Sequence, residues 1–126
     1  MCGFAGFYSA SPTTDAAIGL VADQAEQLFH RGPDAGGAWI NPDLAVGLGH
    51  RRLAIQDLTE AGAQPMHSRC GRFVIVFNGE IYNHLDLRRS DIFSDLERSS
   101  FKGRSDTETL VELIAKWGLE IALQSI

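Results

Sequence analysis

The stretch Cys2–Tyr8 has the sequence CGFAGFY and is the most informative segment for the fold. It alternates small and aromatic residues, which is typical of a strand that starts almost at the N-terminus. Cys2 directly follows Met1, and removal of Met1 would put a thiol and a free α-amine on one residue. This pair combines a nucleophile with a base of near-neutral strength. Position alone favours the alternative, a small buried residue at the start of a strand.

Composition places the chain among ordinary globular proteins. Its 126 residues are 44% hydrophobic and 21% charged, with a formal net charge of −5, which suits one domain with its own core. The acidic balance argues against nucleic acid or an anionic membrane as the main partner. No apolar run reaches the roughly 18–20 residues of a membrane span, and two cysteines make no disulfide framework. We therefore expect a cytoplasmic protein.

The first helix is expected to begin after Pro12 and to end by Arg31, because Gly32-Pro33 cannot continue it. Its apolar residues recur at three- and four-residue steps, which predicts one buried face. These residues are Ala17, Leu20, Val21, Ala25, Leu28 and Phe29. Further short strands are expected at 39–40 and 44–48, around the turn sequence Asn41-Pro42-Asp43, and at 52–55.

The second half of the chain contains one strong strand signal and one strong helix signal. Phe73–Phe77 (FVIVF) is typical of a buried strand, and the Asn78-Gly79 that follows indicates a hairpin when taken alone. Ser105-x-x-Glu108 is a capping box that opens the last helix, and Gly118 ends it. This helix is expected to bury Leu110, Leu113, Ile114 and Trp117. With 88–104 as a helix end and an exposed loop, the chain reads as α+β with a largely antiparallel sheet.

Six short motifs follow one another in a recognisable order. They are MCGFAG at 1–6, HRGPD at 30–34, GHRRLAI at 49–55, GAQPM at 62–66, FNGEIYN at 77–83 and SD at 105–106. This set resembles the glutaminase domain of the asparagine synthetase B family, class II glutamine amidotransferases with an N-terminal nucleophile. The resemblance extends to about Leu119, and HRGPD and GAQP are similar to the asparagine synthetase branch rather than to the phosphosugar amidotransferases. It implies a type 2 glutamine amidotransferase domain over 1–126, with the αββα sandwich of N-terminal nucleophile hydrolases.

The resemblance also implies a reaction. The Cys2 thiolate would attack the side-chain amide of glutamine while its own α-amine moves the proton. Ammonia would leave, and water would release glutamate from the γ-glutamyl thioester. Asn78, through its side-chain amide, and Gly79, through its backbone N–H, match the oxyanion hole, where one donor supplies about 3–4 kcal/mol of transition-state stabilisation. The hairpin turn is the structural alternative for this pair.

Further residues match the family's glutamine-binding groups. Arg52 matches the arginine that binds the α-carboxylate, whereas Arg51 falls at a variable position and is expected to be a solvated charge. Glu80 and Asp106 match the acceptors of the α-ammonium, although a carboxylate at Asp106 would also be favoured by the helix dipole. The backbone of 53–56 is expected to line the pocket, with residues Leu53, Ala54, Ile55 and Gln56.

Other chemistry-bearing residues are expected to be structural. Gly32-Pro33 ends a helix, and Asp34 is expected to accept hydrogen bonds from nearby amides, so 30–34 is placed outside the substrate site. The four histidines and Cys70 lack the spacing of metal ligands, so no metal is expected. Cys70 is expected at a strand edge or exposed.

Glutamine and an ATP-dependent synthetase domain, own or separate, are the partners that the resemblance implies. The sequence contains no SGGxDS pyrophosphate loop and no P-loop, so ATP and Mg are expected only in a synthetase domain and no cofactor in this one. Because the family continues beyond 119–126 with further strands, we expect the fold to be incomplete in this chain. Two alternatives stay open: a non-catalytic or incomplete structural or regulatory module, and an N-terminal nucleophile amidohydrolase for another amide. The oligomeric state, a homo-oligomer included, is not decided.

Overall fold

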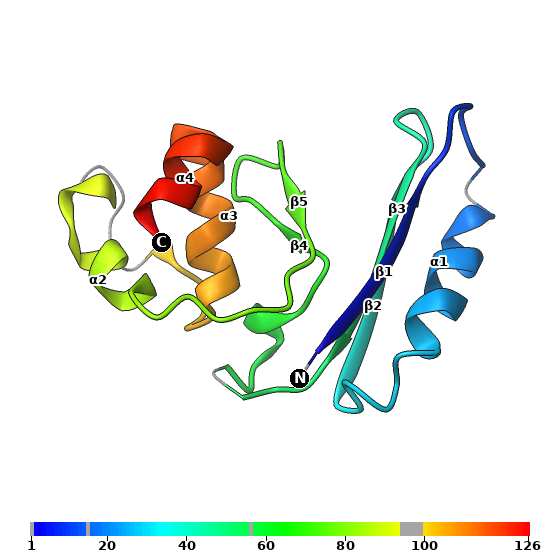
Figure 1. Ribbon diagram of the computed structural model, residues 1–126, viewed down its shortest axis with the longest axis horizontal. Helices are drawn as coiled ribbons and strands as arrows, with labels where there is room; N and C mark the ends of the chain where they lie inside the picture. Colours follow the sequence, from blue (N-terminus) through cyan, green and yellow to red (C-terminus); the bar gives the residue numbers. More distant parts are fainter. Residues whose placement is uncertain (1, 15, 56, 94–99) are drawn as a thin grey trace. The chain divides into compact units, whose positions relative to one another are not determined.

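The computed structural model describes residues 2–14, 16–55, 57–93 and 100–126 (Figure 1). The chain divides into two compact units. The first comprises Met1–Ile55, Ala63–Pro65 and Val76–Asn78, and the second comprises Gln56–Gly62, Met66–Ile75 and Gly79–Ile126. Within the described residues, no helix is both long and apolar enough for a membrane crossing.

The first unit is a three-stranded antiparallel sheet with one helix on its face. β1 (Gly3–Tyr8), β3 (Val46–Arg52) and β2 (Ala35–Asn41) lie side by side in that order. α1 (Ala17–Glu26) runs along one face of this sheet (Figure 1). The strand predicted from CGFAGFY and the strand pair around 41–43 are both confirmed.

Close contact between α1 and the sheet depends on a glycine in β3. A Cβ on Gly49 would lie 2.7 Å from the carbonyl oxygen of Val21, so a larger residue would push the helix outward. Val21 and Ala25 are buried against the sheet. Leu20 and Phe29 were predicted on the same buried face, but they are 55% and 50% exposed. Phe29 lies beyond Glu26, where α1 ends, and therefore leaves the helical stripe.

The strand predicted at 52–55 is wrong. β3 continues without a break to Arg52, and the described residues 53–55 form no strand of their own. Asp34 bonds to the residues before and after Leu53: its N–H donates to the carbonyl of Arg52 (3.0 Å), and its Oδ2 accepts from the N–H of Ala54 (2.8 Å). A side-chain acceptor thus replaces the strand partner that a ladder would need.

The second unit contains a short antiparallel strand pair and the remaining helices. β4 (Met66–His67) pairs with β5 (Val74–Ile75). The helices are α2 (His84–Arg89), α3 (Asp106–Trp117), α4 (Leu119–Ser125) and two 3₁₀ turns, η1 (Glu60–Gly62) and η2 (Asp91–Phe93). Its core gathers side chains from α2, η2, α3 and α4, namely Leu87, Phe93, Leu113 and Ala122.

Two predictions for the middle of the chain are corrected. Phe73–Phe77 forms a strand only at its Val74–Ile75 step, and this run is half-buried rather than fully buried. Asn78-Gly79 is not a hairpin turn, because α2 and not a strand follows it. β5 pairs instead with β4, through a turn that contains Gly71 at φ +71°.

The last predicted helix begins and ends where the sequence signals place it. The Ser105 Oγ accepts from the N–H of Thr107 (3.2 Å), and Gly118 adopts φ 85° at the C-terminal end. Leu110 and Leu113 are buried as predicted, whereas Trp117 is largely exposed. In segment 88–104 the predicted helix end is confirmed, because α2 ends at Arg89. Phe93 is 2% exposed, unlike the exposed loop expected there, and residues 94–99 of that loop lie outside the described residues. The whole is a mixed α/β fold with antiparallel sheets, as predicted.

Candidate active site

Cys2 lies immediately before β1 and is held by both its side chain and its backbone. Its Sγ accepts from the backbone N–H of Leu53 (3.3 Å) and lies 3.6 Å from the Leu53 carbonyl oxygen. The Cys2 carbonyl accepts from Nε of Arg31 at 3.0 Å. The thiol therefore has a defined position beside the segment that follows β3, within the first unit.

The turn 31–34 supplies the other supports of this region. Asp34 is bonded to the residues before and after Leu53, through the Arg52 carbonyl and the Ala54 N–H. Because Leu53 itself contacts the Cys2 sulfur, Asp34 fixes the backbone that faces the thiol. Asp34 accepts from a backbone amide as predicted, but the donor, Ala54, lies 20 residues further along the chain.

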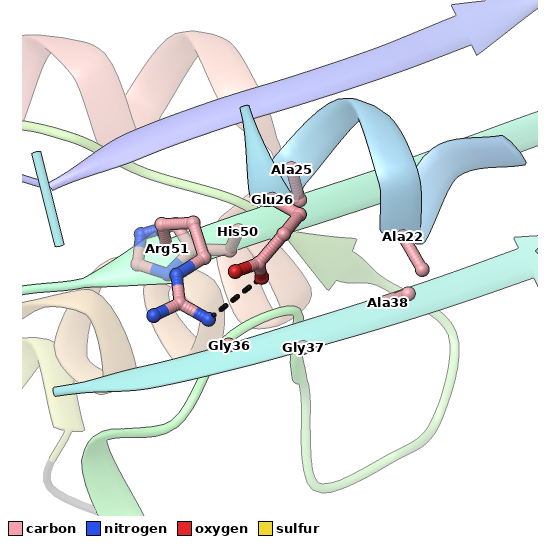
Figure 2. Close-up of a pocket in the computed structure, with 8 residues that line it drawn as sticks. All are labelled: Ala22, Ala25, Glu26, Gly36, Gly37, Ala38, His50 and Arg51. Carbon is pink, nitrogen blue, oxygen red and sulfur yellow. Dashed lines mark hydrogen bonds and ion pairs between the residues drawn. The ribbon is translucent and has the colours of Figure 1, made fainter. Parts of the chain in front are cut away.

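Arg51 is not the solvated charge that the sequence predicted. Its side chain is only 11% exposed, and its Nη1 forms an ion pair with Glu26 at 3.2 Å, drawn in Figure 2. Its Nε donates to the Gly32 carbonyl (2.9 Å), and its Nη2 donates to the Pro33 carbonyl (3.3 Å). The prediction failed because the register of β3 and the end of α1, neither visible in the motif, bring these carbonyls to the guanidinium.

The other predicted site residues of the first unit lie at the end of β3, in the segment that follows it, and at Asn78. Arg52, Leu53 and Ala54 are half-buried, and Ile55 is exposed. Gln56, also predicted to line the pocket, lies outside the described residues. Asn78 is exposed at the end of the Val76–Asn78 segment.

A hydrogen bond from the GAQPM motif fixes the backbone just before Asn78. The N–H of Phe77 donates to Oε1 of Gln64 at 2.6 Å. Gln64 in turn lies against β2, where a Cβ on Gly37 would come within 2.3 Å of the Gln64 carbonyl oxygen. Only glycine leaves room for this approach. The motif therefore places Asn78 by holding its neighbour, a role that sequence reasoning did not assign.

In the second unit, Asp106 performs the same task for the residues after Gly79. Gly79 and Glu80 are exposed, and the N–H of the next residue, Ile81, donates to Oδ2 of Asp106 at 2.9 Å. The other oxygen of Asp106 accepts from the Thr107 N–H at 2.8 Å. A carboxylate has about four acceptor sites, so two backbone bonds orient Asp106 without saturating it.

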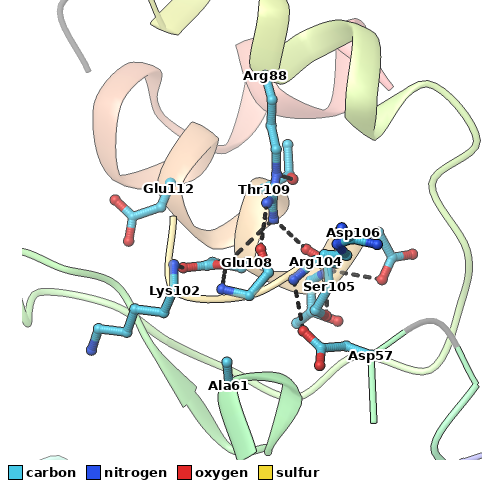
Figure 3. A network of polar contacts seen from close by, with 12 residues as sticks. Asp57, Ala61, Arg88, Lys102, Arg104, Ser105, Asp106, Glu108, Thr109 and Glu112 are labelled. Atoms are coloured by element: carbon cyan, nitrogen blue, oxygen red, sulfur yellow. Dashed lines mark hydrogen bonds and ion pairs between the residues drawn. The ribbon is translucent and has the colours of Figure 1, made fainter. Parts of the chain in front are cut away.

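A buried polar network lies behind the start of α3 (Figure 3). Arg88 donates to Thr109 Oγ1 (2.6 Å) and to the carbonyls of Gly103 (2.7 Å) and Ser105 (2.6 Å), and it forms an ion pair with Glu108 at 3.4 Å. Burial lowers the pKa of Arg88, and the Glu108 charge partly opposes this shift. The sequence offered no sign of this role, since Arg88 stands beside the equally charged Arg89.

Glu108 completes this network from the acceptor side. Its carboxylate accepts from the N–H groups of Lys102 (2.7 Å) and Gly103 (3.0 Å). The capping-box motif predicts that Glu108 accepts from the N–H of the N-cap residue, Ser105. The two observed donors lie upstream of Ser105 instead. Asp57 accepts from the N–H of Arg104 at 2.7 Å, so the whole approach to α3 is held by carboxylates.

A cavity of about 330 Å³ lies beside α1 in the first unit (Figure 2). Its lining residues are Ala22, Ala25, Glu26, Gly36, Gly37, Ala38, His50 and Arg51, which include none of the predicted site residues that the structure describes. His50 is fully buried in β3, and its ring nitrogens make no hydrogen bond with the described residues. Burial lowers the pKa of His50, and the neighbouring Phe77 backbone offsets part of this shift.

Comparison with known proteins now fixes the class. A model of the glutamine amidotransferase domain matches residues 1–126. The chain therefore belongs to the glutamine amidotransferase family, as the motif order predicted.

Three relatives show the range of this family. The chain is 37% identical over 115 residues to asparagine synthetase [glutamine-hydrolyzing] 1 of Bacillus subtilis, covering 90% of the chain and 17% of the relative. It is 35% identical over 128 residues to an amidase of Gibberella zeae, covering 94% of the chain and 18% of the amidase. It is 32% identical over 152 residues to glutamine–fructose-6-phosphate aminotransferase [isomerizing] of Lactococcus lactis, covering 100% of the chain and 24% of the aminotransferase. The chain thus spans about a fifth of the length of these relatives.

Proposed function

We propose that residues 1–126 form the glutamine-hydrolysing, type 2 amidotransferase domain of an N-terminal nucleophile enzyme, with the αββα fold of that class. The observation that carries this proposal is the environment of Cys2. Its thiol lies at the start of the first strand, and two separate contacts, from Leu53 and Arg31, fix its sulfur and its carbonyl. A cysteine with only a packing role would not need its backbone fixed by a distant arginine.

The chemistry follows from a nucleophile and a base on one residue. With Met1 removed, the α-amine of Cys2 takes the thiol proton as sulfur attacks the amide carbon of glutamine. The same amine then delivers the proton to the leaving ammonia, and a γ-glutamyl thioester remains. Water attacks this thioester, releasing glutamate and restoring the thiol.

Asn78 and Gly79 are proposed as the donors for the tetrahedral oxyanion. The Gln64–Phe77 hydrogen bond (2.6 Å) supports this role for Asn78, because a donor must be preorganised before charge develops. The Asp106–Ile81 bond (2.9 Å) does the same for the backbone near Gly79.

Arg52 is proposed to bind the α-carboxylate of glutamine, since its planar fork suits bidentate contact. Glu80 and Asp106 are proposed to accept the α-ammonium. The two backbone bonds of Asp106 support its part, because they orient the carboxylate and leave acceptor sites for an ammonium. The backbone of 53–56 is proposed to complete the pocket.

Ammonia is proposed to pass to an ATP-dependent synthetase domain, which would amidate aspartate or a related acceptor. The similarity to asparagine synthetases of Bacillus subtilis supports this partner. ATP and Mg would belong to that domain, and the glutaminase chemistry above requires only side chains, the α-amine of Cys2, backbone amides and water.

Glutamine hydrolysis by the natural full-length protein and its two single-cysteine variants tests the proposal. Cys2→Ala should reduce glutamate release to background, whereas Cys70→Ala should leave it unchanged, because Cys70 is exposed in the turn between β4 and β5. Mass spectrometry after acid quenching should detect a γ-glutamyl group on Cys2 and a mature N-terminus without Met1. Glutamate release that persists in Cys2→Ala would refute the proposal, and retained Met1 would favour a non-catalytic module.

A second candidate, hydrolysis of a different amide, is favoured by the similarity to an amidase of Gibberella zeae. The two candidates differ in their need for α-carboxylate and α-ammonium groups on the substrate. Butyramide has the same terminal amide as glutamine but lacks both groups. Turnover of butyramide at the glutamine rate, unaffected by Arg52→Ala, would favour the second candidate.

A further inference from the structure

Arg51 stands out because its buried guanidinium has no partner among those predicted substrate groups that the structure describes. Its three nitrogens are distributed over the Gly32 carbonyl, the Pro33 carbonyl and the Glu26 carboxylate. Two of these acceptors are consecutive carbonyls of the turn 31–34. A planar fork can bond to both at once, which the single ammonium of lysine cannot reproduce.

The space around Arg51 is restricted on two sides. A Cβ on Gly32 would lie 2.4 Å from the Arg51 carbonyl carbon, and a Cβ on Gly36 would lie 2.7 Å from Nη1 of Arg51. The turn therefore lies directly on the β3 backbone, and the guanidinium crosses β2 at a glycine. Arg51 also lies 4.7 Å from the ring centre of Phe29, which covers it.

The turn that Arg51 holds carries both supports of Cys2. Arg31, one residue before Gly32, donates to the Cys2 carbonyl at 3.0 Å. Asp34, one residue after Pro33, fixes Ala54 at 2.8 Å and thereby Leu53, which contacts the Cys2 sulfur. The two carbonyls bound by Arg51 thus lie between the two residues that position the nucleophile.

We infer that Arg51 is a positioning residue for Cys2: it holds the turn 31–34 where Arg31 and Asp34 fix the thiol and its surroundings. This inference rests on the proposed function for its catalytic readout only. The Glu26 ion pair is secondary, because the Glu26 side chain is 60% exposed and such pairs contribute little. The carbonyl contacts carry the effect.

The test compares Arg51→Gln and Arg51→Lys with the natural full-length protein. Because Arg51 touches no substrate group, Arg51→Gln should lower kcat for glutamine hydrolysis by about 10- to 100-fold, the range expected for a displaced nucleophile, and change KM by less than about threefold. Arg51→Lys should recover little of the loss, since it restores the charge without the fork. Glu26→Gln should stay within about threefold of the parent kcat.

Two readouts need no glutamine and so separate this inference from the proposed function. Iodoacetamide should alkylate Cys2 at a changed rate in Arg51→Gln, and the amide hydrogens of Leu53 and Ala54 should exchange at least about tenfold faster. Arg89→Gln, at an exposed arginine on α2, is the matched control and should change neither.

If Arg51→Gln does not fold, Gly36→Ala provides the same test, because its new methyl group displaces the guanidinium without removing it. Unchanged alkylation and exchange rates in folded Arg51→Gln or Gly36→Ala would overturn the inference. Altered rates with no glutaminase activity in the parent protein would instead support Arg51 as a positioning residue and refute the proposed function.

Discussion

At the scale of single residues, three polar residues of the motifs fix the backbone beside a predicted site residue. Asp34 flanks Leu53, Gln64 holds Phe77 before Asn78, and Asp106 holds Ile81 after Glu80. Each bond is a side-chain acceptor meeting a backbone N–H that regular structure leaves unpaired. This explains why these short motifs combine polar side chains with glycines: the first supply the bonds, and the second allow the close approach.

Two glycines with opposite surroundings give the first prediction. Gly32→Ala should lower the free energy of unfolding by about 2–3 kcal/mol, because its Cβ would meet the Arg51 backbone at 2.4 Å. Gly19→Ala, in α1 with open space around it, should raise the free energy of unfolding by about 0.5–1 kcal/mol. Urea denaturation of both variants checks this, and equal effects at both positions would contradict it.

The sequence predicted the roles of single residues well only where local context decides them. The Ser105 cap contact spans two residues and is confirmed, whereas the amide that Asp34 binds lies 20 residues further along the chain. The prediction that Arg51 is a solvated charge was wrong, because its burial depends on the pairing of β3 with Gly36 and on the position of the end of α1. Those are distant in sequence, and a single chain carries no record of them.

At the scale of elements, the same contrast separates α3 from the 73–79 region. α3 has a cap, an apolar stripe and a glycine stop that all agree, and its bounds follow them. Asn78-Gly79 has the local signal of a hairpin, but its neighbours bond elsewhere: Phe77 bonds to Gln64, and Ile81 bonds to Asp106. Bonds to distant side chains outweigh the local turn preference there.

The adjacent arginines of α2 give a prediction at this scale. Arg88→Met should lower the free energy of unfolding by about 3 kcal/mol, because it leaves the Glu108 carboxylate, 10% exposed, without its cation and three acceptors without their donor. Arg89→Met removes a 3.9 Å pair between exposed side chains and should change stability by less than about 0.5 kcal/mol.

Thermal and urea unfolding of both variants provides the measurement, and hydrogen exchange at Lys102 and Gly103 locates the effect. Those amides bond to Glu108 and should exchange faster only in Arg88→Met. A similar loss of stability in the two variants would show that the network around α3 contributes no more than a surface ion pair.

At the scale of the whole molecule, the predicted site residues divide between the two units. Cys2, Arg52 and Asn78 belong to the first, and Glu80 and Asp106 belong to the second. The motif order predicted the family, and the pattern of expected strands and helices predicted the antiparallel sheets, because both can be read in the sequence alone. It did not predict the buried titratable groups, because burial of His50 or Arg88 depends on which segments cover them.

The pH dependence of stability follows from these buried groups. Burial lowers the pKa of His50 below the ordinary value of a histidine, and it does the same for His84. In the unfolded chain each histidine takes up a proton as the pH falls through about 6.5, whereas in the folded protein each takes up its proton at a lower pH. The unfolded state then binds more protons, so the free energy of unfolding falls by at most about 1.4 kcal/mol per pH unit for each group.

His50 should dominate this loss, since it is fully buried in β3 and its ring nitrogens lack hydrogen bonds to the described residues. Urea denaturation between pH 7 and pH 5 should show a decline that is shallower in His50→Gln by about 1 kcal/mol over the range, although this variant is less stable at pH 7. His67→Gln, at an exposed position of β4, controls for loss of a histidine as such. Below pH 5 the carboxylates titrate in every variant, so the comparison ends there. Parallel curves for the parent and His50→Gln would show that a water or a rearranged partner already accommodates the proton.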